Sequence, residues 1–568
     1  MVTKNIGHKH PLALTAIAVL LLSSCSQHSF LPPIADKSGV SVSKAVVVND
    51  IPKTQQALAA LLPAQVRLAF PEAVLSVYAT QGGQLIWSDE TLRREFEQQL
   101  VEIALAGVDA QFLQWATWLS SPQLAGTARE LVLTDAMIGY LGFTDGVRAQ
   151  GDRWLYRAGS YSLTRPTTTK IEQWQQSTHN KATFAQYLTQ LAPIHPNYKE
   201  MRQVMNVLYS ESASNAKFNA TSAVKPGNTL TPTNKIALID ALNQAARWSG
   251  DNTLSVSDTL ALENSYNSQF VEKVRRFQGL HGITQDGVIS TQTAEWLNMS
   301  PLTRAKLMAL NIQRLRLLPS AYDTRILVNI PDYFLEFYHN SKLILDSKVI
   351  VGSPSRKTPI MDNALRNVVI NPPWNVPNKL AREDIIPKIK RDPNYVTRLG
   401  YSVYSDWSGS SSPVNPAEVD WHSAQAKNLR FQQSPGSSNA LGRYKFNMPN
   451  SEAIYLHDTP NHRNFERSNR AISSGCIRVN KASTLASILI NGVDGWSDNR
   501  ISGTLKGGKT TYVKLPDNVP VHLFYLTAWK RAQGQTQFRN DIYRYDTMID
   551  NVNVSAQQLN NLLPEITK

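Results

Sequence analysis

The hydrophobic spacing of the chain changes at Pro319, and this change limits the possible folds more than any other sequence feature. Before Pro319, apolar residues such as Leu92, Phe96 and Leu100 recur every three or four positions, which is typical of amphipathic helices. After it, short runs rich in β-branched and aromatic residues predict strands at 326–330, 334–338, 343–351 and 366–370. We therefore expect a multidomain α+β chain that is first helical and then mainly β.

The balance of charge favours an anionic partner. Lysine and arginine number 58 against 44 aspartate and glutamate residues, which gives a formal net charge of +14. A basic chain is attracted to nucleic acid, to an anionic membrane surface or to an acidic polymer, and charge alone does not choose among these. Hydrophobic residues at 42% and charged residues at 18% exclude a wholly disordered or fibrous chain.

The first residues carry the pattern of an export signal. Two lysines precede an apolar or small run at 11–22, which is too short to span a bilayer but suits the core of a signal peptide. The run closes with Leu22-Ser23-Ser24-Cys25, which resembles a bacterial lipobox, where cleavage precedes a cysteine whose thiol carries a diacylglyceryl group. The alternative is an ordinary secretory signal with an incidental cysteine.

A lipobox would decide the location of the protein. Several acyl chains on Cys25 anchor a protein stably, whereas one chain alone gives marginal binding. The resemblance implies a periplasmic, lipid-anchored protein, and Ser26 after the cysteine favours the outer membrane by analogy with enterobacterial lipoproteins. Because an exported chain does not meet nucleic acid, we expect a membrane, through the lipid anchor, and an acidic polymer as partners.

A small module follows the first helical region. Val271, Val274 and Phe277 recur at three-residue steps and form one apolar helix face, and Gly282 and Gly287 allow tight turns. This ordered set, with its Asp-Gly-Val segment and a last helix, resembles the small three-helix peptidoglycan-binding domain. The alternative is a helical module that serves only as scaffold.

The chemistry depends on the second of only two cysteines. Two cysteines exclude a disulfide framework and a four-cysteine zinc site. With Cys25 acylated, Cys476 has no intramolecular partner and stays free in an oxidising compartment. A thiol attacks as a thiolate, so Cys476 needs a neighbouring imidazole that deprotonates it or pairs with it, and His457 can supply that imidazole.

The segments around these two residues resemble a known catalytic signature. Ile454-Tyr-Leu-His457-Asp-Thr-Pro and Ser473-Ser-Gly-Cys476-Ile-Arg-Val-Asn match the L,D-transpeptidases, whose YkuD-type domain cross-links peptidoglycan. The resemblance covers about residues 325–530, and the upstream regions resemble those of the large, multidomain YcbB-type members. Many relatives have a histidine directly before the Gly-Cys pair, where this chain has Ser474, so the base is expected to be His457.

Neighbouring residues are expected to support the nucleophile. The backbone N–H groups of Gly475 and Cys476 are expected to line an oxyanion hole. Arg478 is expected to brace the nucleophile loop or to meet a substrate carboxylate, and we favour bracing. Ser473, Ser474 or a backbone carbonyl is expected to orient the imidazole of the base.

Tyr455 alternates with His457 along a predicted strand, so the two side chains are expected on the same face. Tyr455 would then line the site of the donor substrate. The alternative is a tyrosine packed against the strand.

A long excursion at 372–433 interrupts the predicted strands. It exceeds an ordinary connection, and insertions of this length are usually functional lids or flexible segments. We expect a mobile lid over the substrate groove, and the alternative is a fixed subdomain packed on the β core. Its aromatic and basic side chains offer apolar area and positive charge for an acidic stem peptide: Trp374, Trp407, Trp421, Lys379, Arg382, Lys388, Lys390 and Arg391.

These patterns together predict the organisation of the chain. We expect a lipoprotein signal peptide at 1–24, a flexible tether at 25–46, a helical scaffold domain at 47–225, a peptidoglycan-binding-like domain at 226–300, a helical linker at 301–324, an L,D-transpeptidase catalytic domain at 325–530 with a lid insertion at 372–433, and a C-terminal tail at 531–568.

The resemblance implies a reaction in which Cys476 attacks a tetrapeptide stem of peptidoglycan, expels D-Ala and forms a thioester, with His457 as the proton shuttle. A second stem then resolves the thioester and gives a 3→3 cross-link. Water as acceptor would give an L,D-carboxypeptidase, and a protein lysine would give attachment of a lipoprotein to murein. A non-catalytic wall-binding lipoprotein is the alternative from another class.

No cofactor or metal is expected, because the eleven histidines show no His-Glu-x-x-His or cysteine-paired spacing and no Gly-rich phosphate loop is present. Peptidoglycan, other cell-wall synthases and a D,D-carboxypeptidase that supplies tetrapeptide donors are the partners that the resemblance implies.

Overall fold

The computed structural model describes residues 54–211, 213, 216–219, 221–408, 410–531 and 534–564. The expected signal peptide at 1–24, the lipid attachment site Cys25 and the tether at 25–46 lie outside these residues. Among the helices of the described part, none is long and apolar enough to cross a membrane.

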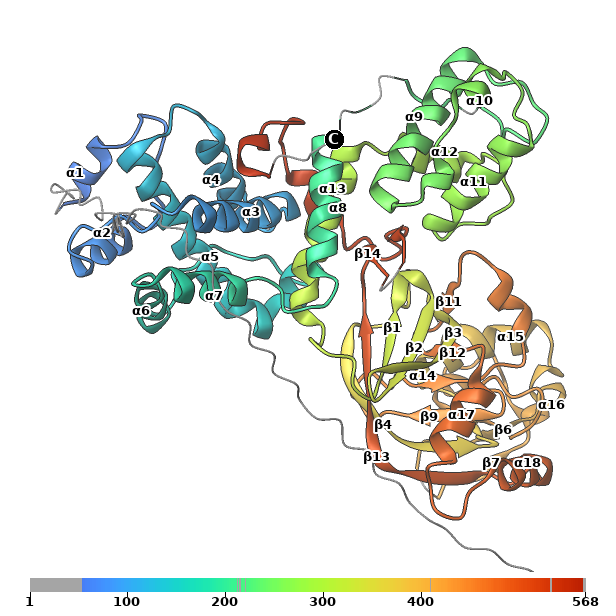
Figure 1. The fold of residues 1–568 in the computed structure, drawn as a ribbon. Coiled ribbons are helices and arrows are strands. Elements are labelled where there is room, and N and C mark those ends of the chain that lie inside the picture. The colour runs from blue at the N-terminus through green and yellow to red at the C-terminus, as the bar shows by residue number, and fades with distance from the viewer. Residues whose placement is uncertain are drawn as a thin grey trace, which may run out of the picture. The chain divides into compact units, whose positions relative to one another are not determined.

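The first region is helical, as expected (Figure 1). Asp89 caps a long helix by accepting a hydrogen bond from the Leu92 N–H, as the sequence Ser-Asp before the first apolar residue predicts. The helices of this region are α1 Gln55–Ala60, α2 Pro71–Thr80, α3 Glu90–Ala106, α4 Ala110–Ser120, α5 Gly126–Leu155, α6 Thr168–Ser177, α7 Lys181–Leu191 and α8 Tyr198–Ser210.

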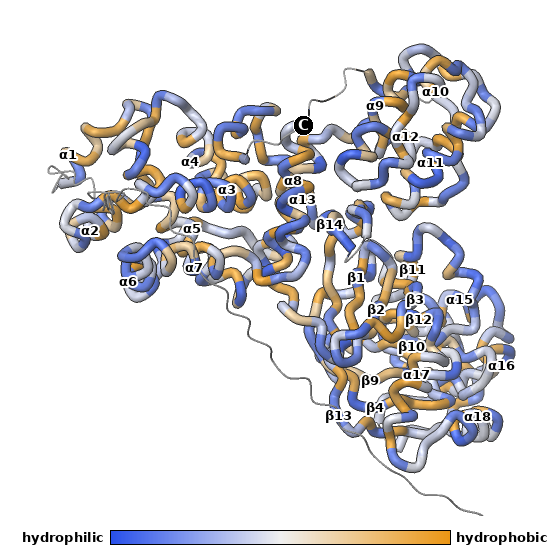
Figure 2. The backbone as a smooth tube through the Cα atoms, in the orientation of Figure 1, coloured by the Kyte–Doolittle hydropathy of each residue, from blue (hydrophilic) through white to orange (hydrophobic). Residues whose placement is uncertain are grey.

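The predicted apolar face of α3 is buried: Leu92 is 6% exposed, and Phe96 and Leu100 are fully buried. Helix α13, Pro301–Arg314, packs against α3 and α8 and buries Leu307 and Leu310 with them. The segment expected as a helical linker at 301–324 is thus helical over α13, and α13 is part of the helical core. Figure 2 shows hydrophobic and hydrophilic residues alternating along these helices.

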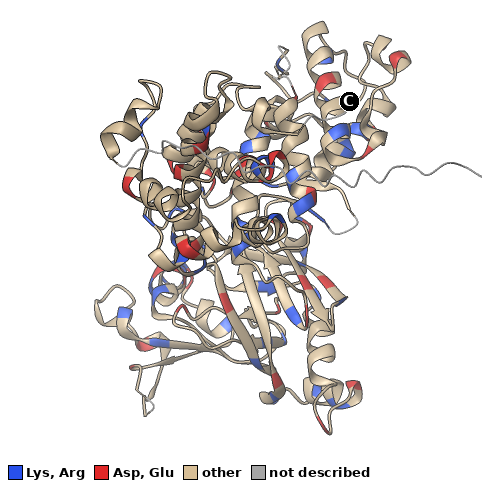
Figure 3. Cartoon of the chain, turned by 60° about the vertical axis from the view of Figure 1, so that its left-hand side comes forward, with Lys and Arg blue, Asp and Glu red and all other residues tan. Residues whose placement is uncertain are grey.

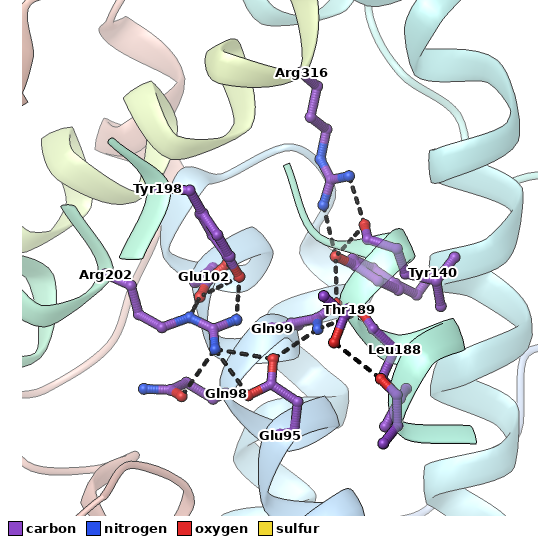
Figure 4. Close-up of polar contacts among 12 residues, drawn as sticks. Glu95, Gln98, Gln99, Glu102, Tyr140, Leu188, Thr189, Tyr198, Arg202 and Arg316 are labelled. Carbon is purple, nitrogen blue, oxygen red and sulfur yellow. Dashed lines mark hydrogen bonds and ion pairs between the residues drawn. The ribbon is translucent and has the colours of Figure 1, made fainter. Parts of the chain in front are cut away.

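A polar network also ties the helical region together (Figure 4). Glu102 of α3 is fully buried and binds Arg202 and the Tyr198 hydroxyl, both of α8. Arg202 Nη1 lies 2.9 Å from Glu95, which extends the network along α3. Arg316, just after α13, donates to the Tyr140 hydroxyl of α5 at 2.6 Å. Because Glu102 is buried and its charge is paired with that of Arg202, the network favours one register of α3 against α8.

The module that resembles a peptidoglycan-binding domain contains α9 Pro232–Ser249, α10 Asp258–Leu262, α11 Ser268–Leu280 and α12 Thr291–Asn298. Val271, Val274 and Phe277 are buried on one face of α11, as predicted. Gly282 and Gly287 have φ values of +62° and +72°, a conformation that favours glycine. The local fold of the module thus agrees with the sequence pattern, and its binding function stays a prediction.

The second region is mainly β. The predicted strands form as β1 Arg325–Asn329, β2 Phe334–His339, β3 Lys342–Gly352 and β4 Met361–Ile370. Further strands are β9 Tyr444–Asn447, β10 Leu456–His457, β11 Ala471–Ser473, β12 Ile477–Val479 and β13 Thr511–Phe524.

These strands form one sheet of order β11-β3-β12-β10-β9-β4-β13-β1-β2. An additional pairing between β2 and β3 joins the two sides of the row, so all strands except β11 close into a barrel. The interior holds Val328, Val368, Phe446 and Leu456, all fully buried. Helix α17, Ala482–Ile490, contacts β4, β9 and β13, and α18, Asp498–Gly507, follows it.

The insertion at 372–433 is a folded unit with its own sheet. Its strands β5 Trp374–Asn375, β6 Tyr401–Tyr404, β7 Pro413–Val414 and β8 Arg430–Gln433 pair in the order β5-β8-β6-β7. It also contains α14 Asn378–Leu380, α15 Ile386–Arg391 and α16 Tyr395–Arg398. Val376, Ile389, Val396 and Phe431 are fully buried in a hydrophobic cluster separate from that of the barrel.

The C-terminal residues pack against both regions. Strands β14 Ala528–Lys530 and β15 Thr536–Phe538 pair, and Phe538, Leu559 and Leu562 are buried in the hydrophobic cluster of the helical region. The expectation of a C-terminal tail at 531–568 was therefore wrong for the described residues, because these apolar side chains need a core. Acidic and basic residues are interspersed along the ribbon in Figure 3, so the net positive charge is not confined to one element.

Candidate active site

Cys476 and His457 lie on adjacent strands of the barrel. His457 ends β10, and Cys476 directly precedes β12, which runs parallel to β10. Both side chains line one cavity of about 570 Å³ at the junction of the barrel and the insertion. The structure thus brings together the two residues that the sequence predicts as nucleophile and base.

The loop before Cys476 has a conformation that requires glycine. Gly475 has a φ of +119°, which L side chains rarely adopt. Its N–H donates to Ser473 Oγ at 3.1 Å, and Ser473 Oγ donates to the Cys476 carbonyl at 2.6 Å. The expected role of the Gly475 N–H in an oxyanion hole is therefore not supported, because that donor is used inside the loop. The Cys476 N–H makes no hydrogen bond to the residues the structure describes.

A second set of hydrogen bonds braces the same loop from outside. Thr358 is fully buried, and its Oγ1 donates to the Gly475 carbonyl at 2.6 Å and accepts from the Gly352 N–H at 2.8 Å. The Tyr543 hydroxyl accepts from the Thr358 N–H at 3.0 Å and donates to the Gly352 carbonyl at 2.7 Å. The C-terminal segment therefore helps to hold the nucleophile loop.

We expect Thr358→Val to weaken both stability and turnover. The variant keeps the side-chain shape but leaves a buried N–H and a buried carbonyl unpaired, which costs about 1–3 kcal/mol. Urea denaturation and the rate of Cys476 acylation measure the two effects. Thr504→Val removes an exposed hydroxyl of α18 and is the control. Equal stability of Thr358→Val and this control would contradict the bracing role.

Backbone oxygen atoms orient the imidazole. His457 Nδ1 lies 2.5 Å from the Asp458 carbonyl, which can only accept, so Nδ1 carries the proton and Nε2 is the basic nitrogen. Of the expected alternatives, Ser473, Ser474 or a carbonyl, the structure thus supports the carbonyl. Burial, followed by the positive charges of Arg478 and Lys445, lowers the pKa of His457 to about 3. The imidazole is therefore neutral near pH 7.

The thiol is also neutral near pH 7. Burial raises the pKa of Cys476, against hydrogen bonding by Tyr455 and the charges of Lys445 and Arg478, which lower it. The thiol donates a weak hydrogen bond to the Ala453 carbonyl at 3.8 Å, and Tyr455 and Trp374 of the insertion line the cavity beside it. Tyr455 and His457 therefore line the same cavity, as their alternation along the chain predicts.

The insertion forms one wall of the cavity. Trp374, Lys379 and Lys388 line it, together with Tyr395 and Tyr401. The other predicted contributors lie elsewhere. Trp407 is 46% exposed, Trp421 packs on Phe431 inside the insertion, and Arg382, Lys390 and Arg391 are not among the lining residues.

One arginine connects the insertion to the nucleophile loop. Arg356 forms ion pairs with Glu383 at 2.8 Å and Asp384 at 2.6 Å, and both acids belong to the insertion. Arg356 also donates to Ser474 Oγ at 3.0 Å. Ser474 is therefore an exposed contact of this arginine and does not orient the imidazole.

Arg478 extends into the same cavity from β12. Its Nε is buried without a hydrogen-bond partner, and no acid within the described ranges forms an ion pair with it. The favoured expectation, that Arg478 braces the nucleophile loop, is therefore not supported. Among the described residues no group of histidine, cysteine and acidic side chains could hold a metal ion.

The sequence interpretation missed several contributors. Thr358 and Tyr543 are distant in sequence from Cys476, and no local pattern marks them. Lys445 lies directly opposite His457 in the β9–β10 pairing, which a correct alignment of the two strands would have shown. Arg356 stands in a polar turn after β3, where an arginine is unremarkable without the insertion beside it.

Comparison with known proteins agrees with this geometry. Residues 323–495 match the model of the L,D-transpeptidase catalytic domain, and residues 72–205 match that of the Scaffold domain. A Haemophilus influenzae protein assigned provisionally to the L,D-transpeptidases is 32% identical over 486 residues, which cover 85% of this chain and 80% of the relative.

Two solved structures also align with the chain. An L,D-transpeptidase from Xylanimonas cellulosilytica is 14% identical and covers 54% of this chain and 99% of its own, with a TM-score of 0.18. The Ldtfm–avibactam carbamoyl enzyme is 13% identical and covers 57% and 98%, with a TM-score of 0.16. On the family match and the relative of similar length, the chain belongs to the L,D-transpeptidase family.

Proposed function

We propose that this protein forms 3→3 cross-links in peptidoglycan through a thioester on Cys476. The observation that carries the proposal is that the free cysteine and a neutral, oriented imidazole share one cavity. Family membership supplies the substrate class, because an L,D-transpeptidase acts on peptidoglycan stem peptides.

The proposed reaction has two steps. As the sulfur attacks the carbonyl that precedes the terminal D-Ala, His457 Nε2 takes the thiol proton and a tetrahedral oxyanion forms. The carbon–nitrogen bond then breaks, the proton passes to the D-Ala amine, and the thioester remains. The amine of a second stem attacks the thioester and restores the thiol.

The cavity suits an anionic donor. Arg478, Lys379 and Lys388 line it, and the acids Asp384 and Glu452 are the only carboxylates among its lining residues in the described part. Asp384 is already paired with Arg356. The unpartnered Arg478 guanidinium is therefore the group best placed to bind a carboxylate of the stem peptide.

Product analysis tests this proposal. The purified protein, incubated with defined disaccharide-tetrapeptides, should release D-Ala and yield a dimer with a 3→3 cross-link. Tripeptide as the only product would show that water is the acceptor, as in an L,D-carboxypeptidase. A stem peptide bound to a lysine of an added lipoprotein would show that the enzyme attaches this lipoprotein to murein. Absence of all three products, with binding to murein retained, would favour a non-catalytic wall-binding role and contradict the proposal.

We propose that the insertion closes over the donor once Cys476 is acylated. Its own sheet and hydrophobic cluster allow it to move as a unit, and Arg356 links its acids Glu383 and Asp384 to Ser474 of the nucleophile loop. Hydrogen exchange of the amides in 374–391 should slow on acylation. Equal exchange in the free and acylated protein would contradict the lid and favour the fixed subdomain.

We also propose a periplasmic, lipid-anchored location, on the Leu22-Ser23-Ser24-Cys25 pattern. Labelling of cells with a fatty-acid analogue should mark the native protein and not Cys25→Ser. Equal labelling of both would contradict the anchor at Cys25.

A further inference from the structure

The barrel places two positive side chains on either side of the base. Lys445 of β9 pairs with His457 in the antiparallel register, and His457 pairs with Arg478 of β12 in the parallel register. Side chains at paired positions of neighbouring strands project from the same face of a sheet. Lys445, His457 and Arg478 therefore form one cross-strand row, which we call the cationic row.

The row ends in apolar residues on both sides. Val369 of β4 pairs with Lys445, and Ile350 of β3 pairs with Arg478. Neither Lys445 nor Arg478 forms an ion pair or side-chain hydrogen bond with a residue that the structure describes. Two half-buried cations thus lack an anion, and burial lowers the pKa of Lys445.

Lys445 contacts the ring of Tyr455, which lies next to the nucleophile. Lys445 Nζ lies 4.1 Å from the centroid of the Tyr455 ring, and the Tyr455 side chain lines the cavity beside the Cys476 thiol and lowers the pKa of that thiol. A cation over the ring face is favourable and makes the hydroxyl a better donor. The Tyr455 and His457 rings are 5.7 Å apart, so one cation acts on both the base and the nucleophile.

We propose that Lys445 is a positioning residue of this site, which holds His457 as the neutral base and stabilises the negative charge that develops on the Cys476 sulfur. The proposal deepens the proposed function and rests on Cys476 being the nucleophile. The groups that act on the sulfur and imidazole are Lys445, Tyr455 and Arg478, and the cavity adds Arg356, Lys357, Lys379, Lys388, Asp384 and Glu452. Of these, Lys445 is the residue that contacts Tyr455 without lining the cavity.

The pH dependence of Cys476 alkylation by iodoacetamide tests this role without any peptidoglycan substrate. Peptide mass mapping follows Cys476 separately from Cys25. Lys445→Met keeps the stem over Tyr455 but removes the charge, so the thiolate becomes less stable and the alkylation curve moves to higher pH. At a fixed pH below the midpoint, the rate should fall by about threefold or more, since half a pKa unit is about threefold.

Lys445→Arg should restore the wild-type curve, because it keeps the charge. Lys514→Met, which removes an exposed lysine of β13, should leave the curve unchanged. With a tetrapeptide donor, Lys445→Met should lower kcat for acylation and leave KM within about twofold, because Lys445 does not line the cavity.

An unchanged alkylation curve for folded Lys445→Met would overturn the proposal. Lys445→Gln is a second uncharged variant in case Lys445→Met does not fold, and unfolding of both would assign Lys445 a structural role and overturn the proposal as well. If cross-link formation fails but the alkylation curves shift as expected, the positioning role stands and only the proposed reaction is lost.

Discussion

Replacement of Cys476 by alanine should reduce thioester and cross-link formation by about a thousandfold or more, because a thioester needs a thiol. The thiol is the single free sulfur nucleophile among the described cysteines and lies in the cavity with His457. The alanine side chain removes only the sulfur, so the loop held by Ser473 and Thr358 should keep its conformation. The rate of D-Ala release measures the loss.

Two controls separate chemistry from folding. The midpoint of thermal denaturation of Cys476→Ala should be close to that of the wild type, because the substitution removes only one partly buried sulfur atom. Thr504→Val, on the exposed face of α18, should retain full D-Ala release. D-Ala release near the wild-type rate in folded Cys476→Ala would place the nucleophile elsewhere.

Replacement of His457 by glutamine should lower the acylation rate by about a hundred- to ten-thousandfold, the usual contribution of a general base. Glutamine can still donate to the Asp458 carbonyl, as His457 Nδ1 does, but it cannot accept the thiol proton. Because burial and nearby cations lower the pKa of His457 to about 3, the wild-type base stays unprotonated throughout the neutral range. The loss in rate should therefore be similar at pH 6 and pH 8.

A neighbouring histidine provides the matched control. His462 is exposed and lies 3.6 Å from Asp458, five residues beyond the base. His462→Gln should retain the acylation rate within about twofold, since His462 is exposed and does not line the cavity. Equal losses in His457→Gln and His462→Gln would exclude His457 as the specific base.

Local patterns predicted the elements that depend on local physics. The three-residue spacing of Val271, Val274 and Phe277 predicts a buried helix face, and the structure confirms it. The strands 326–330 and 334–338 follow from runs of β-branched and aromatic residues, and they form as β1, shifted by one residue at both ends, and β2, longer by one residue at its end. Cys476 and His457 were predicted because the segments around them resemble the catalytic signature of the L,D-transpeptidases.

Contacts between distant segments could not be predicted in this way. Helix α13 has the period of a surface helix, yet Asn311 and Arg314 are buried because the C-terminal segment supplies Thr527 and Asp546 as partners. Phe538 and Leu559 likewise pack against the helical region, which lies far from them in the sequence. A local sequence pattern therefore does not show which residues they contact.

The site shows the same limit at the level of single residues. The oxyanion role expected for the Gly475 N–H stays a prediction, and in this structure Ser473, two residues earlier, accepts the hydrogen bond of that N–H. Lys445 was not predicted, because it lies opposite His457 only through the pairing register of β9 and β10. The distance between the two residues in the sequence does not reveal this register. Of the three tryptophans expected to offer apolar area, Trp374 lines the cavity, whereas Trp407 is 46% exposed and Trp421 packs on Phe431.

Intact-protein mass spectrometry tests the central claim, a thioester on Cys476, most directly. After incubation with a tetrapeptide donor and no acceptor, the wild-type protein should gain the mass of the donor minus D-Ala, and hydroxylamine should remove this adduct. Peptide mapping should place it on the peptide that contains Cys476. The same adduct on folded Cys476→Ala, or no adduct on wild-type protein that releases D-Ala, would contradict the account.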